Sequence, residues 1–384
     1  MRVVVSCIPQ AGHIGPLLPL AEAFVAQGDA LVFASGPDAE AAVVQHGLEF
    51  RQVGPAFGQW YEDLRSRTRG LPGDGLPPSR VEHYFLPRLF GEIGAAAMID
   101  GLIDVCRTVD AELLVFDSLV FAGPLAASVV GARGVQHTVG VLVHPDVTQL
   151  VTDAVSPLWR EFDRDVPPAA GMYEGVTVAV CPPSLDPSAA DRPGIIHMRP
   201  VPEPVSPANP ISALPEGEAP AVYVTLGTFS NNVALFRDLV DALAPVSARF
   251  LFTVGRDVDP HHLGPLPANV RVEQFIPQAE VLPHCDAAIH HGGAGTTFGI
   301  LAHGLPSVVL PQSADNFTIA ERVRTAGAAE VLMPGRSEPR EIQEALRIVL
   351  EDAGYRDAAR SLANEIAAMP SPSEIAADLR TDPD

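Results

Sequence analysis

Residues 289–297 read IHHGGAGTT and place two histidines directly before a glycine-rich turn and two threonines. The apolar residues before the turn are typical of a strand, and a helix-like pattern begins near Gly295. Glycine lets the backbone approach an anion closely, and the start of a helix offers unpaired N–H groups at the positive end of its dipole. Thr296 and Thr297 add hydroxyl donors, and the imidazole of His291 can donate a hydrogen bond or carry charge. The stretch therefore favours a diphosphate-binding site.

A metal site and a plain bend are the two other interpretations of this stretch. His290 and His291 are adjacent on a strand and point to opposite faces, so they do not easily chelate one ion together. A plain strand–turn–helix bend would need only one glycine, and it stays open as the alternative. The dinucleotide fingerprint GxGxxG and the Walker pattern with its lysine are both absent from the sequence.

A second candidate group lies in the first half of the chain. His13 follows the strand-like run at 2–8, and Asp117 ends the strand-like run at 112–117. Both are expected at the carboxyl edge of one parallel sheet, where such sheets bind ligands. Histidine titrates in the range that a general base needs, and a carboxylate can orient its ring. We therefore expect His13 to act as a base with Asp117 as its partner. The other histidines considered for this role are His83, His137 and His144.

The elements that must position these residues form two blocks of short β-branched runs that alternate with helical ones. In the first block, strands are expected at 2–8, 30–35 and 112–117, and helices at 15–28 and 38–47. In the second, strands are expected at 221–227, 249–255, 270–275, 287–291 and 306–311, with a helix at 233–246. This alternation argues for parallel sheets covered on both faces. We expect an α/β protein with two Rossmann-like, doubly wound domains facing a central cleft.

Composition narrows the class of protein. The 384 residues suit two domains, and 25 basic against 47 acidic side chains give a net charge of −22, which argues against a nucleic-acid partner. The four cysteines form no CxxC pair, so we expect neither a disulfide framework nor a zinc site. The longest apolar region, 112–132, is interrupted by Asp117, Gly123 and Pro124 and does not read as a membrane span. We expect a soluble, cytoplasmic protein with no membrane partner; the sequence leaves its oligomeric state open.

The segment FIPQAEVLPHCDAAIHHGGAGTTFGILAHGLPSVVLPQSADN at 275–316 resembles the donor-binding signature of nucleotide-sugar glycosyltransferases with the two-domain GT-B fold. Within that family it is most similar to the bacterial enzymes that glycosylate antibiotics and other natural products of the macrolide type. The runs GHIGPLLPLAEAFVAQG at 12–28 and LGT at 226–228 fall where the family has shorter motifs. The resemblance therefore extends over the layout of the whole chain.

The resemblance implies a role for each part of the chain. Residues 1–200 would form an acceptor-binding domain with the catalytic base, and the proline-rich residues 201–217 a linker. Residues 218–369 would bind the nucleotide-sugar donor, and the helix at 370–384 would return to the N-terminal domain. In the family, a histidine and an aspartate at the positions of His13 and Asp117 form the base and its partner.

The resemblance also implies the donor contacts. The aromatic residue at the nucleobase matches Phe275, and Gln278 lies near the base and the sugar. The diphosphate site matches His291 with the turn Gly293, Gly295, Thr296 and Thr297, and Thr228 matches a second phosphate contact. Asp315 and Asn316 match the pair that holds sugar hydroxyls. Taken singly, Phe275 could be an ordinary core residue and Asp315 a helix N-cap.

Two departures from the family pattern bear on the donor. Many relatives that use uridine diphosphate sugars have a glutamate for the ribose hydroxyls where this chain has Gly299. A carboxylate there is useful only if a 2′-hydroxyl donates to it, so Gly299 favours a dTDP-linked donor, whose deoxyribose lacks that group. Asn316 stands where glutamine is common, and the shorter amide is consistent with a modified or deoxy sugar. The implied activity is an inverting transfer to a hydroxyl of a hydrophobic natural-product aglycone, with no cofactor and no metal.

The acceptor would lie against the N-terminal domain. We expect residues 55–104 to be a long, irregular, aromatic-rich stretch that either lines a hydrophobic acceptor pocket or pins its own loops. The stretch 138–172 with Trp159 is a second candidate wall. The aromatic candidates are Phe57, Trp60, Tyr61, Tyr84 and Phe85.

Three alternatives to this interpretation are kept. The spelling Asp257-Val258-Asp259 resembles a manganese motif, but it falls in a loop that is more simply a solvated turn. A non-hydrolysing nucleotide-sugar epimerase could use the same fold, although such enzymes lack a large aromatic acceptor region. A non-catalytic auxiliary relative is the third, and the presence of His13, Asp117 and His291 argues against it.

Overall fold

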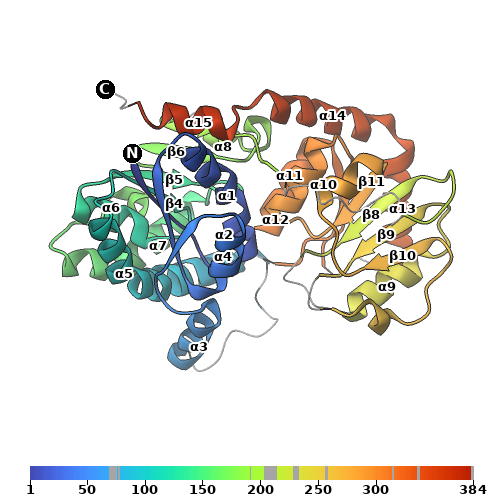
Figure 1. Ribbon diagram of the computed structural model, residues 1–384. Coiled ribbons are helices and arrows are strands. Elements are labelled where there is room, and N and C mark those ends of the chain that lie inside the picture. Colours follow the sequence, from blue (N-terminus) through green and yellow to red (C-terminus); the bar gives the residue numbers. More distant parts are fainter. Residues whose placement is uncertain are drawn as a thin grey trace. The chain divides into compact units, whose positions relative to one another are not determined.

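The computed structural model describes residues 1–68, 76, 78–190, 192–202, 214–227, 233–255, 258–313, 315–334 and 338–381. The chain divides into two compact units (Figure 1). The first comprises Met1–Arg199 together with Met369–Asp384, and the second comprises Pro200–Ala368. Among the described residues, none of the helices is long and apolar enough to cross a membrane.

The first unit is built on a seven-stranded sheet in the order β3-β2-β1-β4-β5-β6-β7, with every strand pair parallel. The order reverses between β1 and β4, and ligands of doubly wound sheets bind at the carboxyl ends of the strands at such a switch point. Both strands have buried apolar runs, which is the pattern of a sheet covered on both faces. The strands are β1 (Arg2–Ser6), β2 (Ala30–Ser35), β3 (Glu49–Gln52), β4 (Leu113–Asp117), β5 (Arg133–His137), β6 (Val176–Ala179) and β7 (Ile195–His197).

The helices of this unit differ from expectation in two places. Helix α1 begins at Ala11, four residues before the expected start at Gly15, although Pro16 and Pro19 lie inside it. The stretch 55–104 is not an irregular loop, because its described residues are largely helical, so that expectation was wrong. The helices are α1 (Ala11–Ala26), α2 (Glu40–Gln45), α3 (Phe57–Thr68), α4 (Pro78–Phe85), the π-helical segment Leu86–Gly94, α5 (Ala95–Thr108), α6 (Ala122–Val130), α7 (Pro145–Glu161), α8 (Pro187–Ala190) and α15 (Pro372–Asp378).

The π-helical segment joins α4 to α5 and brings two other helices close. Its two glycines provide the space: a Cβ atom on Gly94 would lie 2.5 Å from the Trp60 ring, and one on Gly91 would lie 3.3 Å from the Ala154 methyl group of α7. Pro87 lacks the N–H group that a regular helical hydrogen bond needs, which favours a local departure from α geometry.

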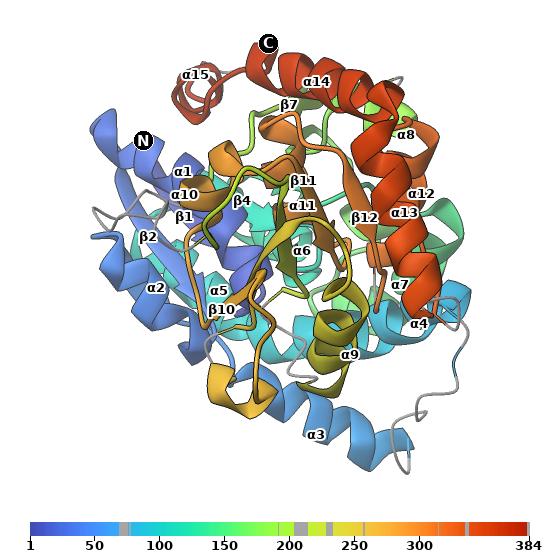
Figure 2. The same ribbon diagram turned by 90° about the vertical axis from the view of Figure 1, so that its right-hand side faces the viewer.

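The second unit repeats the plan with a six-stranded parallel sheet in the order β10-β9-β8-β11-β12-β13, so the order reverses between β8 and β11. Figure 2 shows α9 and α13 on one side of this sheet, where Gln343 donates to the Ala242 carbonyl. The strands are β8 (Ala221–Thr225), β9 (Arg249–Thr253), β10 (Val270–Glu273), β11 (Ala287–His290), β12 (Ser307–Val309) and β13 (Ala329–Val331). The helices are α9 (Val233–Leu243), α10 (Gln278–Val281), α11 (Ala294–Ala302), α12 (Asn316–Thr325), α13 (Pro339–Glu351) and α14 (Ala353–Ala368).

After α14 the chain returns to the first unit, where α15 packs on α1 (Figure 1). Ser371 and Glu374 form a capping box that starts the helix after Pro370. At its other end, the Arg380 guanidinium contacts the buried Asp29 carboxylate at 2.8 Å and donates to the Gln27 carbonyl. Two doubly wound α/β units were predicted from the sequence, and this prediction is confirmed.

Candidate active site

His13 and Asp117 form a hydrogen-bonded pair at the switch point of the first sheet. Asp117 is the last residue of β4, and His13 lies in the first turn of α1, directly after β1. The His13 Nδ1 atom lies 2.6 Å from Asp117 Oδ2. The carboxylate side chain is fully buried, and the imidazole is 15% exposed.

The surroundings of Asp117 fix its carboxylate in place. The backbone N–H of Ile8 donates to Oδ2 at 3.2 Å, and that of Leu119 donates to Oδ1 at 2.9 Å. A carboxylate held in this way accepts the Nδ1 proton of His13 and leaves Nε2 as the proton-accepting atom of the neutral ring. Burial, reinforced by the negative charge of Asp117, raises the pKa of the nearby Cys7 thiol well above its ordinary value, so Cys7 stays protonated at neutral pH.

The other three histidines considered as bases occupy different environments. His137 is the register partner of Asp117 on β5, but it is completely buried and burial lowers its pKa to about 4. His144 caps α7 by accepting from the Asp146 N–H. His83 lies half-buried on α4. Of these histidines, His13 is the one that contacts a carboxylate at the switch point.

In the second unit, the stretch 289–297 crosses from β11 into α11 at the switch point. Gly293 is the N-cap residue of α11 and has no side chain with which to cap this end, and the first turn of the helix has no acidic residue. A helix start of this kind presents unpaired N–H groups to an anion. Gly295 is exposed in the first turn, where a Cβ atom would meet nothing within 4 Å.

The His291 imidazole lies against the backbone of two glycines. A Cβ atom on Gly227, which follows β8, would lie 2.5 Å from His291 Cε1, and one on Gly293 would lie 2.4 Å from Nε2. Any side chain at either position would therefore displace the ring. Burial lowers the pKa of His291 to about 4, so at pH 7 the ring is neutral and acts as a hydrogen-bonding group.

The two threonines of the turn differ. Thr297 is buried, and its hydroxyl donates to the Gly293 carbonyl at 2.9 Å, so it stabilises the turn and would have to leave this bond to reach a ligand. Thr296 is half-buried, and its hydroxyl accepts from Gln278 Nε2 at 3.1 Å. This bond connects two of the residues predicted to contact the donor.

The remaining predicted donor residues lie in loops and helix starts of the second unit. Phe275 is half-buried between β10 and α10, so it is not an ordinary core residue. Asp315 precedes α12 without capping it through its side chain. Asn316 is buried at the start of α12, and its Oδ1 accepts from the Ser313 N–H at 3.3 Å. Thr228 lies outside the described residues.

The predicted acceptor aromatics form one network in the first unit, but they differ in burial. Phe57 and Trp60 belong to the hydrophobic core, with ring centroids 5.3 Å apart. Tyr61, Tyr84 and Phe85 are half-buried at the edge of this cluster, and burial raises the pKa of Tyr61. These three side chains are the exposed edge of the network.

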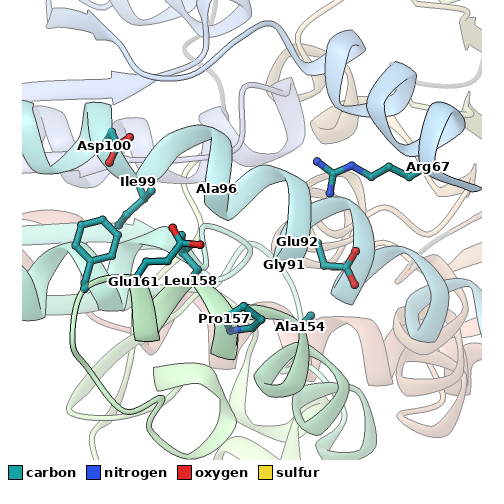
Figure 3. Close-up of a pocket in the computed structure, with 11 residues that line it drawn as sticks. Arg67, Gly91, Glu92, Ala96, Ile99, Asp100, Ala154, Pro157, Leu158 and Glu161 are labelled. Atoms are coloured by element: carbon teal, nitrogen blue, oxygen red, sulfur yellow. The ribbon is translucent and has the colours of Figure 1, made fainter.

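A separate hollow of about 400 Å³ lies between α5 and α7 of the first unit (Figure 3). Its lining includes apolar side chains such as Ile99 and Leu158. The charged lining residues are Arg67, Glu92, Asp100 and Glu161. All of its lining residues fall in the stretches 55–104 and 138–172 that were expected to wall the acceptor, although none of the five aromatic candidates is among them.

Within the described ranges, no group of three or more His, Cys, Asp or Glu side chains could hold a metal ion. Asp257 of the DxD spelling lies outside these ranges, and Asp259 caps the short helix Pro260–Leu263 by accepting from the His261 N–H at 2.9 Å. Metal independence stays a prediction.

Comparison with known proteins places these observations in a family. Residues 237–381 match the family described as erythromycin biosynthesis protein CIII-like, C-terminal domain. The chain is 30% identical to the L-demethylnoviosyl transferase of Streptomyces niveus, over 99% of this chain and 97% of the relative. It is 27% identical to the 3-alpha-mycarosylerythronolide B desosaminyl transferase of Saccharopolyspora erythraea, over 98% and 96% of the two chains.

Two solved structures share the fold over the whole chain. The glycosyltransferase SnogD from Streptomyces nogalater is 31% identical, with a TM-score of 0.78 and 99% of each chain covered. The glycosyltransferase SsfS6 from Streptomyces sp. SF2575 was solved in complex with thymidine diphosphate. It is 25% identical, with a TM-score of 0.80 and 99% of each chain covered.

Proposed function

This chain belongs to the GT-B family of natural-product glycosyltransferases, and we propose that it transfers a deoxysugar from a dTDP-linked donor to a hydroxyl group of a hydrophobic aglycone. The transfer is a single displacement with inversion at the anomeric carbon, and it needs no metal ion. The second unit binds the donor, and the first supplies the base and binds the acceptor.

The observation that carries the proposal is the uncapped N-terminus of α11 beside the neutral imidazole of His291. A diphosphate leaving group gains negative charge as the glycosidic bond breaks. Backbone N–H groups and a fixed imidazole N–H stabilise such charge without reorganising, which is the form of electrostatic catalysis that lowers a barrier most. Asp315 and Asn316 at the start of α12 are the proposed contacts of the sugar hydroxyls.

The base follows from the geometry of the first unit. The acceptor hydroxyl must lose its proton as its oxygen attacks the anomeric carbon, and the His13 Nε2 atom accepts that proton. Asp117 holds the ring in the required tautomer and stabilises the imidazolium that forms. Tyr61, Tyr84 and Phe85 are the proposed contacts of the aglycone, because they form the accessible edge of the aromatic network.

The preference for thymidine rests on Gly299 of α11. A Cβ atom there would lie 3.2 Å from Gln278 Oε1, so the amide of Gln278 occupies the space that a longer side chain would need. Position 299 therefore provides no carboxylate for a ribose 2′-hydroxyl, which suits a deoxyribose. The complex of SsfS6 with thymidine diphosphate supports the same nucleotide class.

Titration calorimetry with dTDP and with UDP, in the presence of EDTA, tests the donor half. We expect tighter binding of dTDP, and a loss of roughly 10- to 100-fold in His291→Ala, the value of a hydrogen bond to a charged group. Asp117→Asn is the control, because it should bind dTDP like the wild type while transferring sugar about 10³-fold more slowly or worse. If neither nucleotide binds without a metal, or UDP binds better, the donor assignment is wrong.

A further inference from the structure

His290 is a buried histidine next to the proposed diphosphate site, and the mechanism does not use it. It ends β11 with a fully buried side chain. Its Nδ1 atom accepts a hydrogen bond from the Gly292 N–H at 3.1 Å, and its Nε2 atom lies 3.2 Å from Ser307 Oγ on β12. The ring therefore carries its proton on Nε2, and it connects β12 to the first residue of the glycine turn.

Thr225 repeats this contact on the neighbouring strand. It ends β8 and is the register partner of His290. Its Oγ1 accepts from the Gly227 N–H at 3.3 Å, again two residues further along the chain. Gly227 and Gly292 both have left-handed φ angles, +79° and +88°, so each side chain holds the backbone where it enters a turn that only glycine adopts readily.

The two turns held in this way border the proposed diphosphate site. Gly227 lies against the His291 ring, and a Cβ atom on Gly292 would lie 3.0 Å from the Asn316 carbonyl oxygen. A shift of either turn would thus move a proposed phosphate or sugar contact. Both side chains are buried, and Gly292 is buried as well, so removal of His290 leaves the Gly292 N–H without an acceptor; Gly227 is half-buried.

We propose that His290 and Thr225 are a matched pair of positioning residues that hold the turns at Gly292 and Gly227 in the geometry that binds the donor diphosphate. The inference rests on the proposed function, because it deepens the assignment of the diphosphate site. His290 must stay neutral for this role, since only an unprotonated Nδ1 can accept from Gly292. Burial lowers its pKa to about 3, which keeps it neutral at physiological pH.

The test compares substitutions that remove the acceptor atom with substitutions that keep it. His290→Leu and Thr225→Val remove it, whereas His290→Asn and Thr225→Ser keep an acceptor oxygen in a similar place. We expect dTDP to bind roughly tenfold more weakly to the first two, and within about threefold of wild type to the second two. Thymidine, which has no diphosphate, should bind all five proteins equally in a competition titration.

Ser307→Ala is the matched control for loss of stability. It leaves the buried His290 Nε2–H without its partner but keeps the bond to Gly292, so we expect a lower melting temperature with unchanged dTDP affinity. Equal weakening of dTDP binding in Ser307→Ala and His290→Leu would overturn the proposal, as would wild-type affinity in His290→Leu.

Amide exchange separates failure of this proposal from failure of the proposed function. If the wild-type protein does not bind dTDP, the proposed function is wrong. The contact itself is tested separately by exchange of the Gly292 N–H. Loss of its protection in His290→Leu supports the contact, and unchanged protection refutes it.

Discussion

At the scale of single residues, the His291 imidazole can occupy its position only because two neighbouring residues are glycines. Gly227 and Gly293 leave the space that the ring occupies. We expect Gly227→Ala to weaken dTDP binding by at least tenfold, because its Cβ atom would lie 2.5 Å from the ring and force it to move. Calorimetric titration of dTDP measures the effect.

Gly227→Ala also strains the backbone, so the resulting loss of stability needs a separate control. Gly131 has nearly the same φ angle, +77° against +79°, but a Cβ atom there would meet nothing within 4 Å. Both substitutions should cost roughly 1–2 kcal/mol of stability through left-handed strain. Only Gly227→Ala should lose dTDP, and loss of dTDP affinity in Gly131→Ala as well would show that the effect is a general loss of stability.

Sequence patterns can locate such residues but not their contacts. The glycine turn and His291 stand out because glycine, histidine and threonine cluster within nine residues. The contact of His291 with Gly227 joins segments more than sixty residues apart, and it follows from the pairing of β8 with β11. The same pairing makes Thr225 the partner of His290, which no local pattern of residues indicates.

At the scale of elements, the short turn Pro168–Gly171 is strained. Ala169 has φ 49° and ψ 32°, and Ala170 has φ 57° and ψ 24°, so two residues with Cβ atoms adopt a left-handed conformation in succession. We expect Ala169→Gly to stabilise the protein by about 1 kcal/mol, because glycine removes this strain and Ala169 is only half-buried. Urea unfolding followed by tryptophan fluorescence measures the change.

An alanine in a regular helix provides the opposite case. Ala96 is exposed in α5, and Ala96→Gly should destabilise the same unit by about 1 kcal/mol. Opposite signs for the two substitutions are the expected result. Destabilisation by both would mean that the left-handed turn is not strained in solution.

The elements themselves were predictable to different degrees. The alternation of strands and helices predicted both sheets, because their central buried strands are continuous apolar runs, but it did not predict the strands β3, β5, β6, β7 and β13. The predicted helix at 15–28 corresponds to α1, which begins four residues earlier at Ala11, so the type of this element was predictable but its first residue was not. The helices of 55–104 were missed although α3 buries Phe57, Trp60 and Leu64 at the i, i+3, i+7 spacing of an amphipathic helix, because the many glycines and prolines of this stretch favour loops.

At the scale of the whole molecule, three fully or largely buried histidines with lowered pKa values are divided between the two units. His137 belongs to the first unit, with a pKa of about 4. His290 and His291 belong to the second, with pKa values of about 3 and about 4. In the unfolded chain each titrates near 6.5, so below that pH the unfolded state binds protons that the folded state does not. Stability should therefore fall as the pH decreases from about 6.5 to about 4.

The two tryptophans of the sequence, Trp60 and Trp159, both lie in the first unit, so their fluorescence reports the unfolding of that unit alone. Between pH 6.5 and 4, His137 should account for about 1.4 kcal/mol of lost stability per pH unit. We expect His137→Phe to flatten this dependence by that amount, measured as the free energy of urea unfolding at pH 7.5, 6.5, 5.5 and 4.5. Every other titrating group is common to both proteins, so the difference in slope belongs to His137 even if the substitution also changes stability at pH 7.5. Parallel curves for wild type and His137→Phe would show that His137 is protonated in the folded protein and that its burial is less complete in solution.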